Sequence, residues 1–575
     1  MNVVGILPIL ILITAQSVQS KSINPHIVFI LADDLGWNDV GFHGSNQIPT
    51  PNIDAMAYSG IILNNYYVTP ICTPSRSALL TGKYPIHTGL QHGVVHGSTP
   101  YGLSLNETLL PQFMKMGGYV TRIIGKWHLG MQHRVIYGCE PWGLSLNESI
   151  LPEYLKKAGY VTSIVGKWHM GHFKQDYLPL SRGFDSHYGY WTGHQDYFDH
   201  TAIEKNKYWG YDMRRGMDVA WSDYDSYTTD LFTKEAVKVI EEHDKTKPLF
   251  LYLAHLAVHS ANFYDPLQAP FQTVSKFSYI KDKQRRLFAG MLSKLDESVG
   301  SVVTALAEAN MLNNSVIIFS TDNGGPAAGF NLNAASNWPL RGASKPYVKD
   351  TLWEGGVRGA AFIWSPLLPS SKVSDTLIHI TDWLPTLISL TNYSSGHKLV
   401  IDGINIWPSL ISNHTSSRKE ILLNIDNERH VAALIHKNWK YKEGNTGIWN
   451  NWYGPSGRDM KYNWTQLYNC AATKAIQDIK PLPDKTTISA IRKKTEIRCK
   501  APGKAQISDT YLFNLETDPC ETDNLAATQP DIVQRMKMKL EMYQRTVIPP
   551  RNKPTDERSD PKNWGYVWTN WMDYI

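Results

Sequence analysis

Neither positive nor negative charge is in large excess in this chain. Its 575 residues carry a formal net charge of only +5, and Lys and Arg form no long run. Proteins that bind nucleic acid need a strongly basic surface, so we exclude that class and expect no nucleic-acid partner. The hydrophobic fraction of 42% and the charged fraction of 19% are those of a globular protein. The length suits one large domain plus a smaller one.

Long apolar runs are equally scarce. Residues 3–15 are almost wholly apolar, and small residues follow them up to Ser20. We interpret residues 1–20 as a secretory signal peptide, although no Lys or Arg precedes the apolar run; a retained membrane anchor is the alternative. No other stretch reaches spanning length, so we expect no membrane span after signal removal.

Six N-x-S/T sequons also indicate a glycosylated product of the secretory pathway, either lysosomal or extracellular. They lie at Asn106, Asn147, Asn313, Asn392, Asn413 and Asn463.

Two apolar segments end in oxygen-bearing side chains. His26 to Ala32 is a nearly continuous apolar run, as expected of a buried parallel strand, and Asp33 and Asp34 follow it. A second such run leads into Asp322 and Asn323. Ligands bind at the carboxyl ends of strands in open α/β sheets, and hard divalent cations prefer these oxygens. The four side chains therefore predict a cation site; solvated turns are the alternative.

A third apolar strand, residues 248–254, is followed by two histidines. We expect His255 to be a satisfied core or loop residue, whereas His259 falls at the carboxyl end of the strand. Farther along, residues 285–310 predict an amphipathic helix with Asp296 on its polar side.

An internal repeat relates residues 102–130 to residues 143–171, with 19 of 29 positions identical. Each copy contains a helix pattern, a Gly-Tyr turn, a strand and the sequence Gly-Lys-Trp-His. Two such similar copies are no solenoid. We interpret them as a tandem duplication, 90–130 and 131–171, of which one copy is looped out. The alternative is an inserted helix–strand unit at the sheet edge.

The stretch Cys72-Thr-Pro-Ser-Arg76 begins a predicted helix that leads to Thr81-Gly82. Taken alone, it is also compatible with a free or disulfide-bonded Cys beside a Pro turn. Together with the other motifs, however, it resembles the signature of the type I sulfatases. That resemblance covers about residues 24–545 and includes Asp-Asp after the first strand, C-T-P-S-R, G-K-W-H, the strand-end His, D-N-G-G and L-W-E-G-G. The arylsulfatase B group, which removes 4-sulfate from N-acetylgalactosamine in dermatan and chondroitin sulfate, is the most similar.

The resemblance implies an α/β fold of the alkaline-phosphatase kind. We expect a large mixed sheet sandwiched by helices over residues 21–415 and a smaller domain with an antiparallel sheet over residues 416–575. A final helix is expected near residues 532–544.

The resemblance also implies the reactive groups. Cys72 would be oxidised by the formylglycine-generating enzyme to Cα-formylglycine, whose hydrate is the nucleophile. Ca²⁺ would be bound by residue 72 and by Asp33, Asp34, Asp322 and Asn323, and would act as a Lewis acid on a sulfate oxygen.

In the implied mechanism, Arg76 holds the diol while one of its hydroxyls attacks sulfur. The alcohol leaves with a proton from His259 or Lys349, and Lys167, Lys349 and His259 offset the sulfate charge. The second hydroxyl then collapses to the aldehyde with His169 as base and expels sulfate, after which water restores the diol.

Two assignments have sequence alternatives. Lys126 and His128 of the first copy are chemically equivalent to Lys167 and His169, because residues two apart on a strand share a face. We expect the second copy to fill the site, since Cys139 belongs to it and completes an even set of cysteines once Cys72 is modified.

The family's sulfate-binding lysine precedes L-W-E-G-G, but the connection between Gly342 and Leu352 is longer here. Counting back from Leu352 selects Lys349, and counting forward from Gly342 selects Lys345. We take Lys349. By resemblance, two disulfides are also expected: Cys470–Cys499 and Cys139–Cys520.

Two other functions fit the same motifs. If Cys72 stays unmodified, the chain would be a catalytically silent, secreted carbohydrate-binding protein. The second alternative function is the hydrolysis of phosphoesters or phosphonates with the same aldehyde as nucleophile. Within the sulfatase interpretation, both sulfated carbohydrates and aryl sulfates are open as substrates.

Overall fold

The computed structural model describes the chain in fifteen parts. They are residues 24–92, 120–125, 163–165, 175, 178, 186–204, 207–327, 332–342, 351–369, 371–391, 400–412, 417–444, 454–499, 507–549 and 557–574. Several predicted features lie outside these residues: the signal peptide, Lys126, His128, Lys167, His169, Lys345, Lys349, Cys139 and the sequons at Asn106, Asn147, Asn392 and Asn413.

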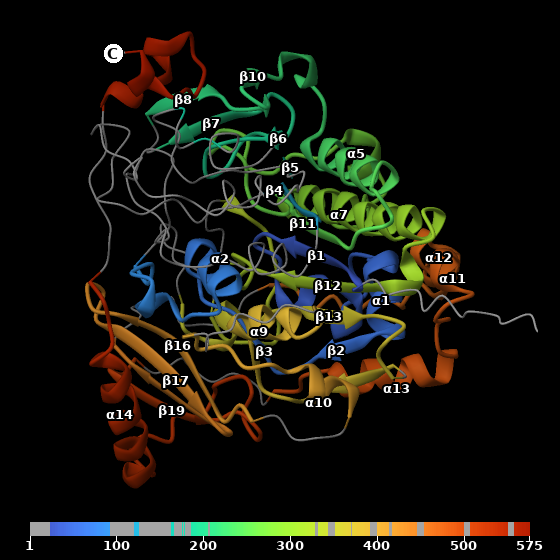
Figure 1. Cartoon of the computed structure of the whole chain (residues 1–575). Helices are drawn as coiled ribbons and strands as arrows, with labels where there is room; N and C mark the ends of the chain where they lie inside the picture. The colour runs from blue at the N-terminus through green and yellow to red at the C-terminus, as the bar shows by residue number, and fades with distance from the viewer. Residues whose placement is uncertain are drawn as a thin grey trace, which may run out of the picture.

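Eleven strands form one mixed sheet in the order β10-β9-β6-β5-β4-β11-β1-β12-β13-β2-β14 (Figure 1). The six strands from β6 to β12 run parallel, and β13 pairs antiparallel with β12. The strands are β1 His26–Ala32, β2 Ile61–Leu63, β4 Val120–Gly125, β5 Ser163–Val165, β6 Ser186–Gly189, β9 Arg214–Arg215, β10 Asp218–Val219, β11 Leu249–Ala254, β12 Ser315–Thr321, β13 Ala361–Trp364 and β14 Lys372–Ser374.

Helices cover both faces of this sheet because its central strands are apolar on both. In β1, Val28 and Ile30 enter one hydrophobic core, and Ile27 and Phe29 enter the other, as the two-residue period of a strand requires. The first core includes helices α1 Pro51–Ser59, α5 Thr228–Glu241 and α7 Lys283–Glu308. The second includes α2 Cys72–Thr81, α9 Trp383–Ile388 and α10 Trp407–Ile411. The predicted layered α/β fold is confirmed.

A second, four-stranded antiparallel sheet follows in the chain and confirms the predicted C-terminal sheet. It consists of β16 Glu420–Asp426, β17 Val431–His436, β18 Trp439–Glu443 and β19 Thr510–Asn514, and α14 Pro530–Gln544 packs against it. Between β18 and β19 the chain returns to the large sheet, where α12 contacts α1 and α7. The remaining described strands and longer helices are β3 Tyr66–Tyr67, β7 Thr201–Glu204, β8 Tyr208–Tyr211, β15 Ile378–His379, α6 Phe271–Ser275, α8 Glu354–Val357, α11 Trp464–Asn469, α12 Ala471–Ile476 and α13 Lys485–Thr495.

Both copies of the repeat contribute a strand to the large sheet. β4 of the first copy pairs in parallel with β11, with Gly125 opposite Ala254, and β5 of the second copy pairs with β4. Neither strand is at the edge, because β5 also pairs with β6. The expectation that the first copy is looped out is therefore wrong. The alternative, an inserted helix–strand unit, agrees better with the observed sheet, although its strand lies inside the sheet rather than at the edge.

Asp296 is buried in α7, so its predicted place on the polar side of that helix is wrong. Its carboxylate accepts hydrogen bonds from the backbone N–H of Ile53, at 2.9 Å, and from Nδ2 of Asn52, at 2.8 Å. Both donors belong to the first turn of α1, where backbone N–H groups lack partners within the helix. Burial raises the pKa of Asp296 to about 7.

The disulfide found in the described residues joins Cys499 to Cys520, whose Cα atoms are 5.8 Å apart. Both predicted pairings, Cys470–Cys499 and Cys139–Cys520, are therefore wrong. Cys499 and Cys520 belong to one small hydrophobic cluster with Trp37, whereas the thiol of Cys470 contacts the backbone oxygens of Pro51 and Leu467 beside α1. Sequence spacing did not indicate which cysteines share a cluster.

Two observations bear on the expected secretory route. Within the described parts of the chain, no helix has both the length and the apolar character needed to cross a membrane. The side chains of Asn313 and Asn463, the two sequon residues that are described, are exposed, as acceptors of a glycan must be.

Candidate active site

The adjacent strands β1 and β12 bring the four predicted cation ligands together at their carboxyl ends. Ala32 is opposite Thr321, so the residues that follow each strand leave the sheet side by side. The N–H of Asp34 donates to Oδ1 of Asp322 at 3.2 Å, and Nδ2 of Asn323 donates to Oδ1 of Asp34 at 2.8 Å. Asp34 occupies the left-handed region, with φ of 62°, which turns the chain sharply beyond the strand.

Helix α2 brings Cys72 to the same place. Cys72 is the first residue of α2, and its side chain is buried. Its sulfur and carboxylate oxygens of Asp33 and Asp322 lie within 4.8 Å of one another. The predicted nucleophile position and part of the predicted cation site therefore form one cluster.

One turn farther along α2, the buried guanidinium of Arg76 connects the two strands electrostatically. Its Nε and Nη2 donate to Oδ2 of Asp322, at 3.1 and 2.9 Å, and Nη2 is 3.3 Å from Oδ2 of Asp33. Burial alone would lower the pKa of Arg76, but the charges of Asp322 and Asp33 outweigh it and raise the pKa above its ordinary value. Arg76 is therefore charged and its position is determined by two carboxylates.

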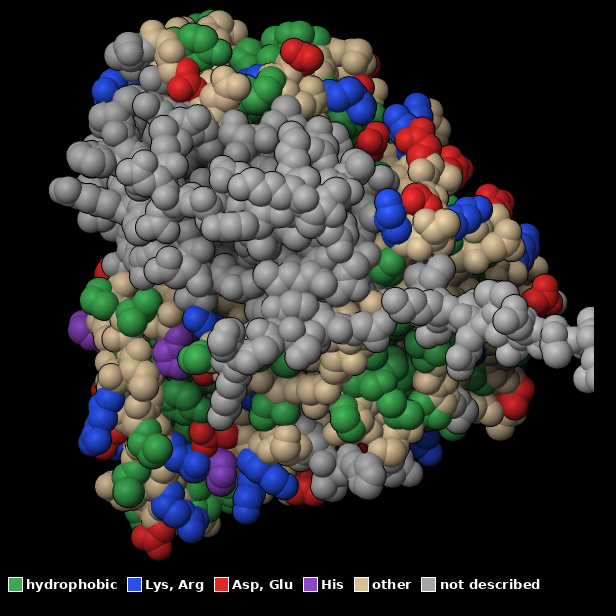
Figure 2. Space-filling model, viewed as in Figure 1, with side chains coloured by type: hydrophobic (Ala, Val, Ile, Leu, Met, Phe, Trp, Pro, Cys, Tyr) green, Lys and Arg blue, Asp and Glu red, His purple; other side chains and the backbone are tan. Residues whose placement is uncertain are grey.

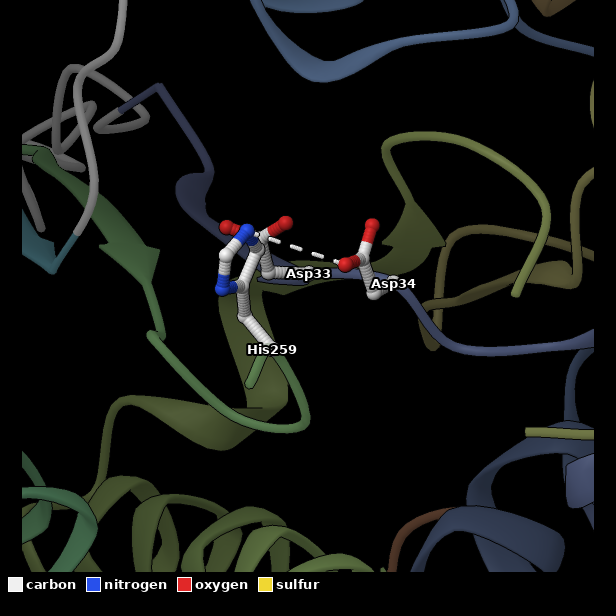
Figure 3. A group of neighbouring side chains, drawn as sticks. All are labelled: Asp33, Asp34 and His259. Carbon is white, nitrogen blue, oxygen red and sulfur yellow. Dashed lines mark ion pairs between the residues drawn. The ribbon is translucent and has the colours of Figure 1, made fainter. Parts of the chain in front are cut away.

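His259, in the loop after β11, lies beside the carboxylates of Asp33 and Asp34 (Figure 3). Its Nε2 is 3.7 Å from Oδ2 of Asp34, and its Nδ1 is 2.6 Å from the carbonyl oxygen of Ser260. A carbonyl only accepts, so Nδ1 carries a hydrogen and donates it. That bond orients the ring and directs Nε2 toward the cluster. The ring of His194 stacks on His259, with centroids 6.4 Å apart.

The charges of this cluster fit a divalent cation. Within the described part of the chain, the carboxylates of Asp33, Asp34 and Asp322 gather around one guanidinium, that of Arg76, so carboxylates outnumber guanidinium groups in this cluster. The buried Oδ1 of Asn323 has no hydrogen-bond partner among the described residues. Buried negative charge needs compensation, and carboxylate and amide oxygens are the ligands of hard cations. The residues present therefore fit the predicted cation site.

His255, by contrast, lies in the core, as predicted, but only one of its two ring nitrogens is satisfied, because its buried Nδ1 has no hydrogen-bond partner among the described residues. Its Nε2 and Oγ of Ser298 in α7 are 3.1 Å apart, and its ring is fully buried. Burial lowers its pKa to about 3, so the ring is neutral at physiological pH.

Sequence reasoning missed two features of this site. It assigned Arg76 to the diol but did not predict its ion pairs with Asp33 and Asp322, and no local spacing signals a contact between residues 246 positions apart. It also overlooked His194, which stands in an aromatic loop without any motif. The predicted lysines and the second histidine of the site lie outside the described residues.

Comparison with known proteins agrees with this geometry. The sulfatase family model matches residues 25–137 and 129–393. Arylsulfatase J of Mus musculus is 38% identical over 551 residues, which cover 95% of this chain and 80% of the relative. N-acetylgalactosamine-6-sulfatase of Homo sapiens is 30% identical over 408 residues, which cover 68% of this chain and 67% of the relative. The crystal structure of Ps i-CgsB superimposes with a TM-score of 0.65 at 25% identity and covers 94% of this chain and 97% of that one. The chain belongs to the sulfatase family, whose activity is the hydrolysis of sulfate esters.

Proposed function

We propose that this sulfatase hydrolyses sulfate monoesters with Cα-formylglycine, made from Cys72 by the formylglycine-generating enzyme, and with Ca²⁺. The observation that carries the proposal is the position of Cys72. It begins α2, is buried, and its sulfur shares a 4.8 Å cluster with carboxylates of Asp33 and Asp322. A cysteine in a turn at the surface would have none of these neighbours.

Each described residue of the site then has a role. Asp33, Asp34, Asp322 and the side-chain oxygen of Asn323 would hold the cation together with residue 72. When bound, the cation and the hydrated aldehyde supply Lewis acidity and a nucleophile whose second hydroxyl permits sulfate release. Arg76, positioned by its two carboxylates, orients the side chain of residue 72 one turn before it in the helix.

His259 suits proton transfer to the leaving alcohol. Because Nδ1 donates to the carbonyl of Ser260, Nε2 is the ring nitrogen that gains or loses the proton. We propose Lys349 as a further cation that offsets the sulfate charge, with Lys345 as its alternative.

The sugar specificity is proposed from the relatives and from the motif resemblance. By its name, the human relative acts on 6-sulfated N-acetylgalactosamine. Resemblance to the arylsulfatase B group favours the 4-sulfate of the same sugar. We propose a terminal sulfated N-acetylgalactosamine as substrate and a lysosomal or extracellular location.

The test compares 4-nitrocatechol sulfate with the corresponding phosphate. We expect turnover of the sulfate, its loss in EGTA, and its return when Ca²⁺ is added, because three carboxylates without a cation would repel the anionic ester. Preferred turnover of the phosphate would support a phosphoester hydrolase instead. Turnover of neither ester, with the aldehyde verified by mass analysis, would support a silent carbohydrate-binding protein.

The repeat supplies two candidate pairs for the remaining site positions, and the sheet register supports the first. β4 pairs directly with β11, which leads to His259, whereas β5 is one strand farther away. The residues that follow β4 are Lys126 and His128.

Matched double variants decide between the copies. We expect Lys126→Ala/His128→Ala to lower kcat/KM for 4-nitrocatechol sulfate by about 10³-fold, as loss of a transition-state cation and a base would. Lys167→Ala/His169→Ala, the equivalent change one strand away, should cost less than about fivefold. The reverse order of effects would assign the site to the second copy. Circular dichroism of both variants shows whether the sheet is intact.

A further inference from the structure

The hairpin β7–β8 is completed by the last described residues of the chain (Figure 1). The N–H of Tyr211 donates to the carbonyl of Tyr566 at 2.8 Å, and the N–H of Trp568 donates to the carbonyl of Tyr211 at 3.0 Å. The indole N–H of Trp568 also donates to the carbonyl of Ala202, at 3.1 Å. Residues 566–568 therefore extend this two-stranded sheet through one parallel bridge, between Tyr211 and Val567.

One face of this hairpin carries aromatic rings that are open to solvent. Ile203 is directly opposite Trp209, and Thr201 is opposite Tyr211, so these four side chains share a face. Trp209 contacts Tyr566 edge-to-face, with ring centroids 5.7 Å apart, and the two side chains are 40% and 56% exposed. Trp221 stacks on Tyr211 at 4.3 Å and is 55% exposed.

The same face is joined to the loop that carries His259. The hydroxyl of Tyr264, a side chain that is 51% exposed, is 3.2 Å from Oγ1 of Thr201. Oδ1 of Asn262 accepts from the N–H of Ile203 at 2.8 Å. Both residues follow His259 within five positions, so the hairpin is fixed to the wall of the active site.

A third contact makes this connection rigid. The hydroxyl of Tyr197 donates to the carbonyl of His259 at 2.8 Å, and the neighbouring carboxylate of Asp196 accepts from the N–H of Asn262 at 2.9 Å. The carboxylate also accepts from the hydroxyl of Tyr264. The ring of Tyr264 and the backbone of the hairpin are thus attached to the loop that carries His259.

We propose that Trp209, Trp221, Tyr264 and Tyr566, the aromatic platform, bind the saccharide units that follow the sulfated sugar. This inference rests on the proposed function and narrows its substrate class to sulfated oligosaccharides. Exposed rings of this number at one place mark a binding surface rather than ordinary surface composition. In Figure 2, green side chains lie at the end of the molecule where Figure 1 has β8 and the C-terminal segment.

The chemistry of the platform fits a sugar. A pyranose ring presents an apolar C–H face, which packs on an aromatic ring, and hydroxyl groups at its edge, which need polar partners. An exposed charged pair at the tip of the hairpin can supply such partners: Lys207, two residues before Trp209, and Glu557, whose Nζ and Oε2 are 2.7 Å apart. The platform is attached to the loop that carries His259. A saccharide whose sulfated end lies in the active site can therefore extend onto the aromatic rings. A small aryl sulfate ends in the site and does not reach them.

The test uses the double variant Trp209→Ala/Tyr566→Ala in the full chain. Its kcat/KM is measured on 4-nitrocatechol sulfate and on a chondroitin tetrasaccharide ending in sulfated N-acetylgalactosamine, with 4-sulfate and 6-sulfate forms. We expect the tetrasaccharide value to fall about tenfold, mainly through KM, because two stacking contacts are lost. The value for 4-nitrocatechol sulfate should change less than twofold.

A second readout separates this inference from the proposed function. Calorimetry measures binding of unsulfated chondroitin tetrasaccharide, so it does not depend on turnover. If the double variant binds this tetrasaccharide more weakly than the unsubstituted protein, the result supports the proposed role of the aromatic platform, even if no ester is hydrolysed. Phe271→Ala, which removes an aromatic side chain 80% exposed on α6, is the control and should change neither readout. Equal loss on both substrates, unchanged tetrasaccharide kinetics, or a change in oligomeric state on sedimentation would overturn the proposal.

Discussion

Cys72→Ala is expected to lower kcat/KM for 4-nitrocatechol sulfate by at least about 10⁴-fold, since removing a nucleophile leaves only residual catalysis by binding groups. The variant should fold normally, because the side chain lost is small. Cys72→Ser should be equally inactive in turnover, because a simple hydroxyl that accepts the sulfo group has no second hydroxyl to release it. Mass analysis of the tryptic peptide with residue 72 should find the aldehyde in the unsubstituted protein.

The matched control is Cys470→Ala. Cys470 is the other described cysteine outside the disulfide, and its thiol contacts only backbone oxygens and Thr473 among the partners found for it. Its removal should change kcat/KM less than about twofold, as expected of a site away from the reacting groups. Full activity in Cys72→Ala, or equal losses in both variants, would contradict the assignment of the nucleophile.

Asp322→Ala is expected to abolish activity and to destabilise the fold by about 3–5 kcal/mol, because it removes the main partner of a buried arginine. Arg76 and Asp322 are both fully buried and lie 2.9 Å apart. Asp322 also accepts the N–H of Asp34, so the loss would loosen the turn after β1. Urea unfolding at pH 7 measures the free energy of unfolding, and the sulfate assay measures activity.

The double variant Asp322→Ala/Arg76→Met separates the two effects. With both members of the pair removed, no arginine charge is left buried, but buried Asp33 also loses its ion pair with Arg76. The free energy of unfolding should therefore recover by at most about 1.5 kcal/mol relative to Asp322→Ala. Activity should stay absent, since the cation site has lost a ligand. A single variant that costs less than about 1 kcal/mol would contradict the described burial of this pair.

The strands that carry the site could be predicted because their signal is local. His26–Ala32 is both the predicted apolar run and the observed β1, and β12 ends at Thr321, directly before the predicted Asp322. A buried parallel strand must be apolar on both faces, and a polar residue directly after it must lie at the carboxyl end of the strand, where ligands bind in α/β sheets. Two such strands sufficed to predict that Asp33, Asp34, Asp322 and Asn323 lie together.

Contacts between distant segments could not be predicted in the same way. The partner of Cys499, the burial of Asp296 against α1 and the ion pairs of Arg76 each depend on which segments pack together. The helix pattern of α7 correctly predicted a helix but not that the first turn of α1 would satisfy one of its carboxylates. The interpretation of the repeat failed for the same reason. The positions of β4 and β5 in the sheet depend on which strands they pair with, and the sequence does not specify this pairing.

The sequence by itself determined the residues on which the proposed chemistry depends and the architecture that holds them: the cysteine proposed as the source of the nucleophile, the oxygen side chains at two strand ends, and the α/β layers that apolar runs require. Only the tertiary structure decided the charges that surround Cys72, the position of both repeat strands inside the sheet, and the attachment of the C-terminal aromatic residues to the hairpin β7–β8. The physical reason is that periodicity and strand-end position are properties of neighbouring residues. Ion pairs, disulfides and exposed faces depend on packing between segments hundreds of residues apart.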